Sequence, residues 1–103
     1  MYSKTIAFDS VTIVLPVQDE TYSLTQTIDS IIQSSRPYLQ EILIIVSTHT
    51  SLASLAAIEA LACRFGSLIV IHRQSLPYLG GALREAFDLA RGSHVILMAS
   101  DLE

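Results

Sequence analysis

Four short apolar runs constrain the fold of this chain more than any other feature of its sequence. The runs are VTIVLP (11–16), ILIIV (42–46), SLIVIH (67–72) and HVILM (94–98). All four are rich in Ile and Val, and none alternates cleanly between apolar and polar residues. Continuous apolar runs of this length are typical of strands that are covered on both faces, as in a parallel sheet.

Three segments with helical periodicity separate these runs. The apolar stripes that we expect to face the sheet are Leu24, Ile28, Ile31 and Ile32 in the first segment, Leu52, Leu55, Ala56, Ala62 and Phe65 in the second, and Leu79, Ala82, Leu83, Ala86, Phe87 and Ala90 in the third. We expect Ser23 and Gln26 to form a capping box, Ser51 to cap the second helix and Gly66 to end it.

The order β-α-β-α-β-α-β predicts an α/β fold. With right-handed crossovers it gives a three-layer α/β/α half-Rossmann domain around a four-stranded, mainly parallel sheet. We expect one domain over residues 10–103, with residues 1–9 as an N-terminal tail or an added edge strand. Ligands of such sheets bind beyond the carboxyl ends of the strands, near the point where strand order reverses. The candidate loops are 17–21, 47–51, 73–79 and 99–103.

Composition excludes several classes of function. A formal net charge of −4, with only six scattered Lys and Arg residues, argues against a nucleic-acid surface. The single cysteine, Cys63, excludes a disulfide within the chain, and we expect it to be a buried, inert thiol. We find no apolar run long enough to cross a membrane and no signal-peptide pattern, so we expect a cytoplasmic location.

The first loop, PVQDET, places Asp19 and Glu20 at the start of a helix. Acidic residues there stabilise the positive end of the helix dipole. Alternatively, one carboxylate accepts hydrogen bonds from a ribose or a base edge.

The second loop, STHTS, is rich in hydroxyl groups and has no glycine. It lacks both glycine-rich phosphate-binding motifs, and the chain has no G-x-S-x-G elbow of a serine hydrolase. A capping role accounts for Ser51, whereas the sequence indicates no role for Ser47 or His49.

The third loop brings Gly80 and Gly81 to the start of a helix, with Arg84 one turn further on. Glycines let a ligand or another backbone approach closely, and the amides at a helix start attract phosphate. Arg84 is therefore a candidate to face a diphosphate. Close packing of the helix with a surface arginine explains the same residues equally well.

The fourth loop follows a buried strand and carries Asp101 and Glu103. Carboxylates in this position suit Mg²⁺ or Mn²⁺, which take oxygen ligands and bind nucleotide phosphates. The sequence therefore predicts a divalent-cation site here.

Three segments together resemble the N-terminal half of a family-2 glycosyltransferase of the GT-A fold. VTIVLPVQDETYSLTQTIDSI is similar to the opening strand, Pro-Val-x-Asn-Glu turn and first helix of that family. EILIIVSTHTS stands where the family has an Asp-Asp pair after the second strand, and GGALREAFDLARGSHVILMASDLE resembles the run that ends in Asp-x-Asp. The resemblance covers residues 10–103 and is closest to polyprenyl-phosphate sugar transferases, typified by dolichol-phosphate mannose synthase.

The chain departs from the family pattern at its acidic positions. Val46 and Ser47 stand where the Asp-Asp pair is usual, and Ala99 replaces the first aspartate of Asp-x-Asp. Asp19 replaces the usual Asn of the first turn, and Asp101 retains the second aspartate of Asp-x-Asp.

The resemblance implies a donor-binding portion of an inverting hexosyltransferase that uses a nucleotide-diphospho-sugar and a divalent cation (Mg or Mn). The candidate nucleotide-sugar-binding residues are Pro16, Gln18, Glu20, Ser47, Gly81 and Arg84, and the candidate metal ligands are Asp101 and Glu103. The acceptor site and catalytic base would be encoded downstream, so we expect these residues alone to be inactive. Membrane association would come only from downstream segments.

Two alternatives remain open. The first is a degenerate, non-catalytic relative that acts as a nucleotide-binding or oligomerisation module, with a homodimer formed through an exposed sheet edge. The second, a small flavodoxin-like or receiver-like domain, fits the order of elements. It fits the loops poorly, because a receiver needs an Asp after its third strand, where this chain has His72.

Overall fold

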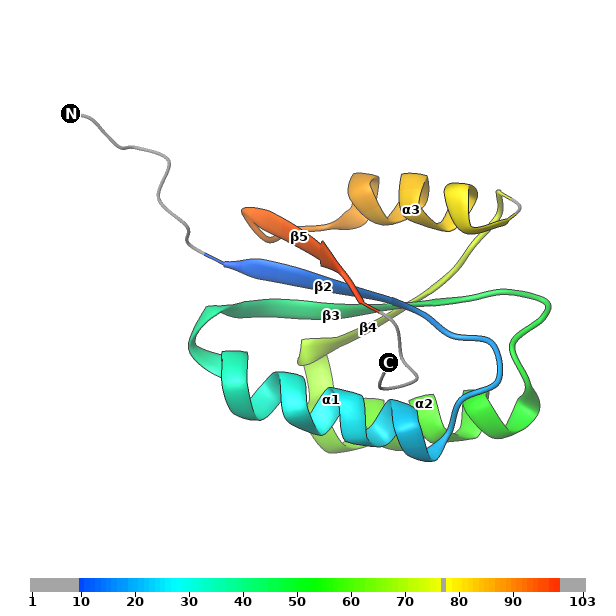
Figure 1. The fold of residues 1–103 in the computed structure, drawn as a ribbon, viewed down its shortest axis with the longest axis horizontal. Helices are drawn as coiled ribbons and strands as arrows, with labels where there is room; N and C mark the ends of the chain where they lie inside the picture. Colours follow the sequence, from blue (N-terminus) through cyan, green and yellow to red (C-terminus); the bar gives the residue numbers. More distant parts are fainter. Residues whose placement is uncertain (1–9, 77, 99–103) are drawn as a thin grey trace.

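A four-stranded parallel sheet forms the middle layer of the domain (Figure 1). The computed structural model describes residues 10–76 and 78–98. Its strands are β2 (Val11–Pro16), β3 (Leu39–Val46), β4 (Ile69–Arg73) and β5 (His94–Leu97). They lie in the order β4-β3-β2-β5, and each neighbouring pair is parallel. Strand order therefore reverses at β2, between its neighbours β3 and β5.

Helices cover both faces of this sheet. The helices α1 (Tyr22–Ser35) and α2 (Leu52–Phe65) lie on one face, and α3 (Tyr78–Leu89) lies on the other (Figure 1). Short 3-10 turns, η1 (Arg36–Tyr38) and η2 (Gly66–Leu68), lead into β3 and β4. The predicted three-layer α/β/α architecture is confirmed.

Two hydrophobic cores explain why the strand sequences do not alternate. The larger core joins Val11, Ile13 and Leu15 of β2 and Ile42, Ile44 and Val46 of β3 to α1 and α2. The smaller joins Val14, Leu43 and Ile45 to Ala82 and Ala86 of α3. Successive side chains of a strand point to opposite faces, so both faces of β2 and β3 require apolar residues.

The helix starts and ends agree only in part with the sequence predictions. The α1 stripe is confirmed, with Leu24, Ile28, Ile31 and Ile32 all buried. The predicted capping box is wrong, because α1 begins at Tyr22 and its N-cap, Thr21, makes no side-chain capping bond. Ser51 does cap α2: its Oγ accepts a hydrogen bond from Ser54 N at 3.1 Å. Gly66 ends α2 with a positive φ of 62°.

The predicted stripe of α2 is confirmed only in part: Leu55, Ala62 and Phe65 are partly buried and pack against the larger core. Leu52 is 84% exposed and Ala56 is also exposed, whereas Ser54, Ile58 and Leu61 are the buried residues. Apolar residues surround most of this helix, so periodicity alone does not identify its inner face. The hydroxyl of Ser54 keeps a hydrogen bond although it is buried, because it donates to the carbonyl of Glu20 at 2.7 Å.

Two further predictions of burial are wrong. In α3, Ala82 and Ala86 are buried, but Leu79 and Phe87 are 56% and 62% exposed. The smaller core contacts α3 through alanines, so the larger apolar residues beside them stay outside it. Cys63 is exposed on α2, because the inner face of that helix is set by Ile58 and Leu61. Within the described residues, no helix is long and apolar enough to cross a membrane.

A buried carboxylate joins three segments at the amino end of the sheet. Glu41 of β3 is 2% exposed and accepts hydrogen bonds from Thr12 Oγ1 (2.8 Å), Arg91 N (2.7 Å) and Arg91 Nε (3.0 Å). Gly92 N donates to Thr12 Oγ1 at 2.9 Å, and a Cβ at Gly92 would lie 2.6 Å from Thr12 N. The link between α3 and β5 is thus fixed against β2 and β3.

The pKa of Glu41 reflects a balance of opposing effects. Burial raises the pKa, but the hydrogen bonds from the Arg91 amide, the Thr12 hydroxyl and the Arg91 guanidinium outweigh it. The pKa therefore lies below its ordinary value of 4.5.

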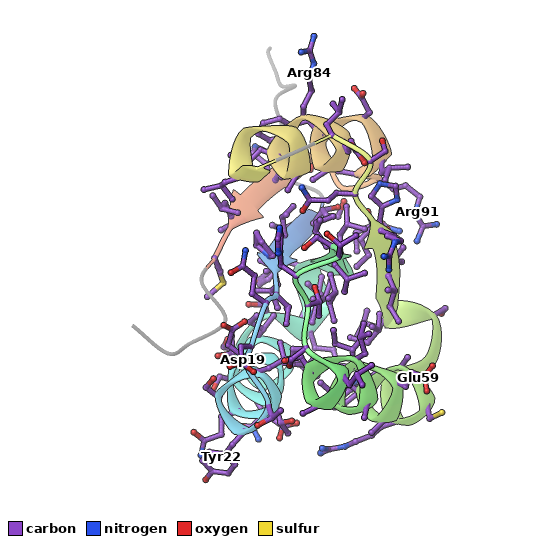
Figure 2. All side chains as sticks on the ribbon, turned by 90° about the vertical axis from the view of Figure 1, so that its right-hand side faces the viewer. Asp19, Tyr22, Glu59, Arg84 and Arg91 are labelled. Atoms are coloured by element: carbon purple, nitrogen blue, oxygen red, sulfur yellow. The ribbon has the colours of Figure 1, made fainter. Side chains whose placement is uncertain are left out.

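Removing this carboxylate should destabilise the whole domain. Glu41→Ala leaves the buried Thr12 hydroxyl and the partly exposed amide and guanidinium of Arg91 without their acceptor. Since water can reach Arg91, we expect the free energy of unfolding to fall by about 2 kcal/mol. Glu41→Gln keeps one acceptor oxygen and should cost about half as much. Urea unfolding measures both. Glu59→Ala, at an exposed position of α2 (Figure 2), should change stability by less than about 0.5 kcal/mol. A Glu41→Ala variant as stable as this control would contradict the account.

The carboxylate of Glu41 should also make the free energy of unfolding decrease at acidic pH. The unfolded chain binds the proton at a higher pH than the folded chain, so the contribution of Glu41 is complete above about pH 4.5 and is lost as the pH falls through the lowered pKa. Urea unfolding between pH 7 and 3 should show a steeper loss for the wild type than for Glu41→Gln. Equal slopes would show that Glu41 does not carry this effect.

One buried hydroxyl should be replaceable with a gain in stability. Thr27 on α1 is 4% exposed, and its Oγ1 has no hydrogen-bond partner in the described structure. We expect Thr27→Val to raise the free energy of unfolding by about 1 kcal/mol, because it removes a buried unsatisfied oxygen at nearly constant volume. Thr25→Val is the matched control: Thr25 Oγ1 donates to the carbonyl of Thr21 at 3.2 Å, so no gain is expected. A loss of stability in Thr27→Val would contradict the assignment.

Candidate functional site

A cavity of about 710 Å³ lies beyond the carboxyl ends of β2, β3 and β4. Figure 2 looks onto this edge of the sheet. Six apolar residues line the cavity, namely Pro16, Val17, Ile45, Leu76, Leu79 and Ala82. Six polar residues complete the lining, namely Gln18, Ser47, Thr48, His49, Gln74 and Ser75. Pockets of about 300–1,000 Å³ with a few convergent polar groups are typical of small-molecule sites. The position agrees with the loops 17–21, 47–51 and 73–79.

The first wall is the β2–α1 loop, which is tied to the start of α2. Thr50 Oγ1 donates to the carbonyl of Val17, Ser51 N to that of Gln18 and Ser54 Oγ to that of Glu20, each at 2.7 Å. Three successive anchors fix the backbone of this loop. The hydroxyl-rich sequence after β3 is thereby explained as a support for the neighbouring loop.

Glu20 closes its own turn. Its carboxylate accepts hydrogen bonds from Gln18 N (3.1 Å) and Asp19 N (3.3 Å). The side chain does not line the cavity, whereas Pro16 and Gln18 do. Contact of Glu20 with a nucleoside therefore stays a prediction.

The β3–α2 loop forms the middle of the cavity. Ser47 Oγ accepts a hydrogen bond from His49 N at 3.1 Å, and Ser47 N donates to Thr50 Oγ1 at 2.9 Å. This tight turn presents Ser47, Thr48 and His49 to the cavity. Sequence reasoning singled out Ser47 and His49 but missed Thr48, which only the shape of the turn reveals.

The β4–α3 loop forms the opposite wall. Gln74 N donates to the carbonyl of Val46 at 2.8 Å and so extends the pairing of β4 with β3. The carboxylate of Glu85 on α3 then accepts hydrogen bonds from His72 Nε2 (2.6 Å), Ser75 N (2.9 Å), Ser75 Oγ (3.0 Å) and Leu76 N. The bond from His72, followed by those from the amides of Leu76 and Ser75, lowers the pKa of Glu85 to about 2.

The other predicted residues of α3 do not reach the cavity lining. A Cβ on Gly81 would lie 2.6 Å from Leu76 Cβ, so this glycine makes room for the loop, whereas Gly80 has open space around it. Arg84 is exposed and projects from α3 away from the sheet (Figure 2). The predicted ligands Asp101 and Glu103 lie outside the described residues.

The described lining combines polar and apolar residues and is nearly uncharged. His49 is its one titratable side chain, and among the described lining residues we find no carboxylate, lysine or arginine. The described residues contain no cluster of three or more His, Cys, Asp or Glu that could hold a metal ion. These residues therefore suit a ligand with many hydrogen-bonding groups, and they do not by themselves form a cation site.

Two solved structures share this fold. One is glucosyl-3-phosphoglycerate synthase from Mycobacterium tuberculosis, crystallised with Mn²⁺, uridine diphosphate and phosphoglyceric acid; it has a TM-score of 0.68 and 20% sequence identity over 89% of this chain. The other, described as a mycobacterial protein, has a TM-score of 0.67 and 24% identity over 97% of this chain. The chain spans 33% and 36% of the lengths of these two proteins.

Comparison with sequence families gives the assignment. No curated protein gives a significant match to the chain. The model of glycosyl transferase family 2, in contrast, matches residues 12–103, which include every strand and helix described above except the first residue of β2. With that match over most of the chain, and with the parallel sheet and cavity in place, this protein belongs to glycosyl transferase family 2.

Proposed function

We propose that this chain is the donor-binding part of an inverting glycosyltransferase that uses a nucleotide-diphospho-sugar. The observation that carries the proposal is the cavity at the carboxyl ends of β2, β3 and β4, with polar side chains from all three loops, in a domain of this family. A protein with the same fold was crystallised with uridine diphosphate and Mn²⁺, which supports a nucleoside diphosphate as the ligand class.

The chemistry of the lining suits a nucleoside. The amide of Gln18 and the hydroxyls of Ser47 and Thr48 offer both donors and acceptors, which a base edge and ribose hydroxyls require. Fixed loops reduce the entropy lost on binding, because the anchors between the β2–α1 and β3–α2 loops exist before any ligand arrives. In this proposal the described residues bind and orient the donor.

A divalent cation would be held by residues outside the described structure. The cavity lining supplies no carboxylate among its described residues, so the proposed site depends on Asp101 and Glu103. Such an ion would neutralise charge on the leaving nucleoside diphosphate. A single aspartate at the Asp-x-Asp position should bind the ion more weakly than two.

Several finer features belong to the same proposal. The chain spans about one third of the solved proteins that it resembles, so we propose that an acceptor site and catalytic base lie outside it and that residues 1–103 alone are inactive. The pattern at the end of β5 favours a polyprenyl-phosphate acceptor of the dolichol-phosphate mannose synthase type, and a cytoplasmic location accords with that. Neither feature affects the donor site.

A second candidate function is a non-catalytic module that forms homodimers through β5. In the described sheet, β5 is an edge strand, and Ile96 and Leu97 are each 47% exposed on it. Adjacent side chains of a strand point to opposite faces, so both faces of this edge are apolar. Sedimentation velocity from 10 to 500 μM tests this candidate: a concentration-dependent dimer that Leu97→Lys abolishes would favour it, and a monomer throughout would remove it.

Calorimetric titration with UDP and GDP tests the primary proposal. We expect one of them to bind, and Gln18→Ala to weaken binding about five- to tenfold through the loss of one hydrogen bond at the cavity. Gln33→Ala, at an exposed position of α1, is the matched control and should leave affinity unchanged. Mn²⁺ should strengthen binding in the wild type but not in Asp101→Ala.

Two results would contradict the proposal. One is the absence of binding by both nucleotides at millimolar concentration. The other is equal loss of affinity in Gln18→Ala and Gln33→Ala, which would place the ligand outside the cavity.

A further inference from the structure

The β4–α3 loop rests on one side chain of α3. Glu85 is 13% exposed and accepts hydrogen bonds from two consecutive backbone amides, those of Ser75 and Leu76, and from the Ser75 hydroxyl. Ser75 and Leu76 both line the cavity. One carboxylate on the helix thus holds two residues of the cavity wall.

His72 fixes the carboxylate from the other side. Its Nε2 lies 2.6 Å from Glu85 Oε1, and the ring extends from β4 toward α3. Glu85 therefore has partners on the strand before the loop and in the loop itself, so its side chain is held in a single orientation. A charged acceptor that binds several donors makes stronger hydrogen bonds than a neutral one.

Gly81 provides a second, independent contact for the same loop. A Cβ built on Gly81 would lie 2.6 Å from Leu76 Cβ and 2.7 Å from the Leu76 carbonyl carbon and oxygen. The backbone of Leu76 therefore packs directly on α3. Gly81 and Glu85 are four residues apart, which places them on the same side of the helix. Gly81 and Glu85 thus both contact the backbone of Leu76.

The two walls of the cavity are held in different ways. Three hydrogen bonds from separate residues of the β3–α2 segment anchor the β2–α1 loop. On the opposite wall, pairing with β3 ends at Gln74, and the described bonds that join Ser75 and Leu76 to α3 all go to Glu85. The shape of this wall should therefore respond to a change in one side chain.

We propose that Glu85 is a positioning residue that holds the β4–α3 loop on α3 and thereby sets the ligand affinity of the cavity. This inference rests on the proposed function, because it assigns a consequence for nucleotide binding. Glu85 does not line the cavity, so it acts through Ser75 and Leu76. The amides of these two residues are already used by Glu85, so a ligand meets this wall mainly through side chains.

The test compares Glu85→Gln, Glu85→Asp and Glu85→Ala with Asp88→Asn. Asp88 is an exposed acid one turn further along the same helix, so its variant controls for charge on α3. The first measurement is amide hydrogen exchange by NMR without ligand. We expect exchange at Ser75 and Leu76 to become at least about tenfold faster in the three Glu85 variants, with Ile44 in the core unchanged. Glu85→Asp should not rescue the loop, because its carboxylate is one methylene too short.

The second measurement is UDP affinity by calorimetry. We expect Glu85→Gln and Glu85→Asp, which keep volume or charge, to bind UDP at least about fivefold more weakly than the wild type, and Asp88→Asn to bind normally. Unfolding curves show whether each variant is folded. If Glu85→Ala does not fold, Glu85→Gln replaces it in the comparison.

Each outcome decides a different claim. Wild-type affinity in folded Glu85 variants, or an equal loss in Asp88→Asn, would overturn the positioning role while leaving the proposed function intact. Unchanged exchange at Ser75 and Leu76 would overturn it as well. If the wild type binds neither UDP nor GDP, the proposed function fails, and the exchange measurement still decides whether Glu85 holds the loop.

Discussion

The structure depends on one constraint: the two central strands, β2 and β3, are buried on both faces. Their side chains contribute to two hydrophobic cores, one between the sheet and helices α1 and α2 and one between the sheet and α3. A sheet of this kind must be parallel or nearly so, because the helices that cover it also connect its strands. All the strand-to-helix loops then emerge at one edge (Figure 1). The cavity is a consequence of this arrangement.

Two carboxylates fix the two ends of the sheet, and both do so by accepting hydrogen bonds from backbone amides. Glu41 holds Arg91 and Thr12 at the amino end, where the described contacts have a structural role. Glu85 holds Ser75 and Leu76 at the carboxyl end, beside the cavity. Hydrogen bonds hold the pKa of each carboxyl below its ordinary value, so both remain charged near neutral pH. The same chemistry therefore stabilises the fold at one end and shapes a binding site at the other.

The sequence contained enough information to predict the architecture but not every helix face. Strand β2 and the inner face of α1 match their predictions because the apolar residues there leave one solution. The inner face of α2 was predicted only in part, because leucines and alanines occupy nearly all sides of this helix and the burial of Ser54 depends on a carbonyl 34 residues away. Glu85 was missed for a similar reason, since its partners lie in a loop whose path only the fold determines. Of the predicted nucleotide-binding residues, Pro16, Gln18 and Ser47 meet in the cavity.

The central claim is that the cavity at the carboxyl ends of β2, β3 and β4 binds a nucleoside diphosphate. The most direct measurement is an NMR titration of the ¹⁵N-labelled chain with UDP. We expect the largest amide shifts at Gln18, Ser47, Thr48 and the 74–76 loop, and no shift at Arg91 and Gly92 at the opposite end of the sheet. Shifts confined to the amino end of the sheet, or spread evenly over the surface, would contradict it.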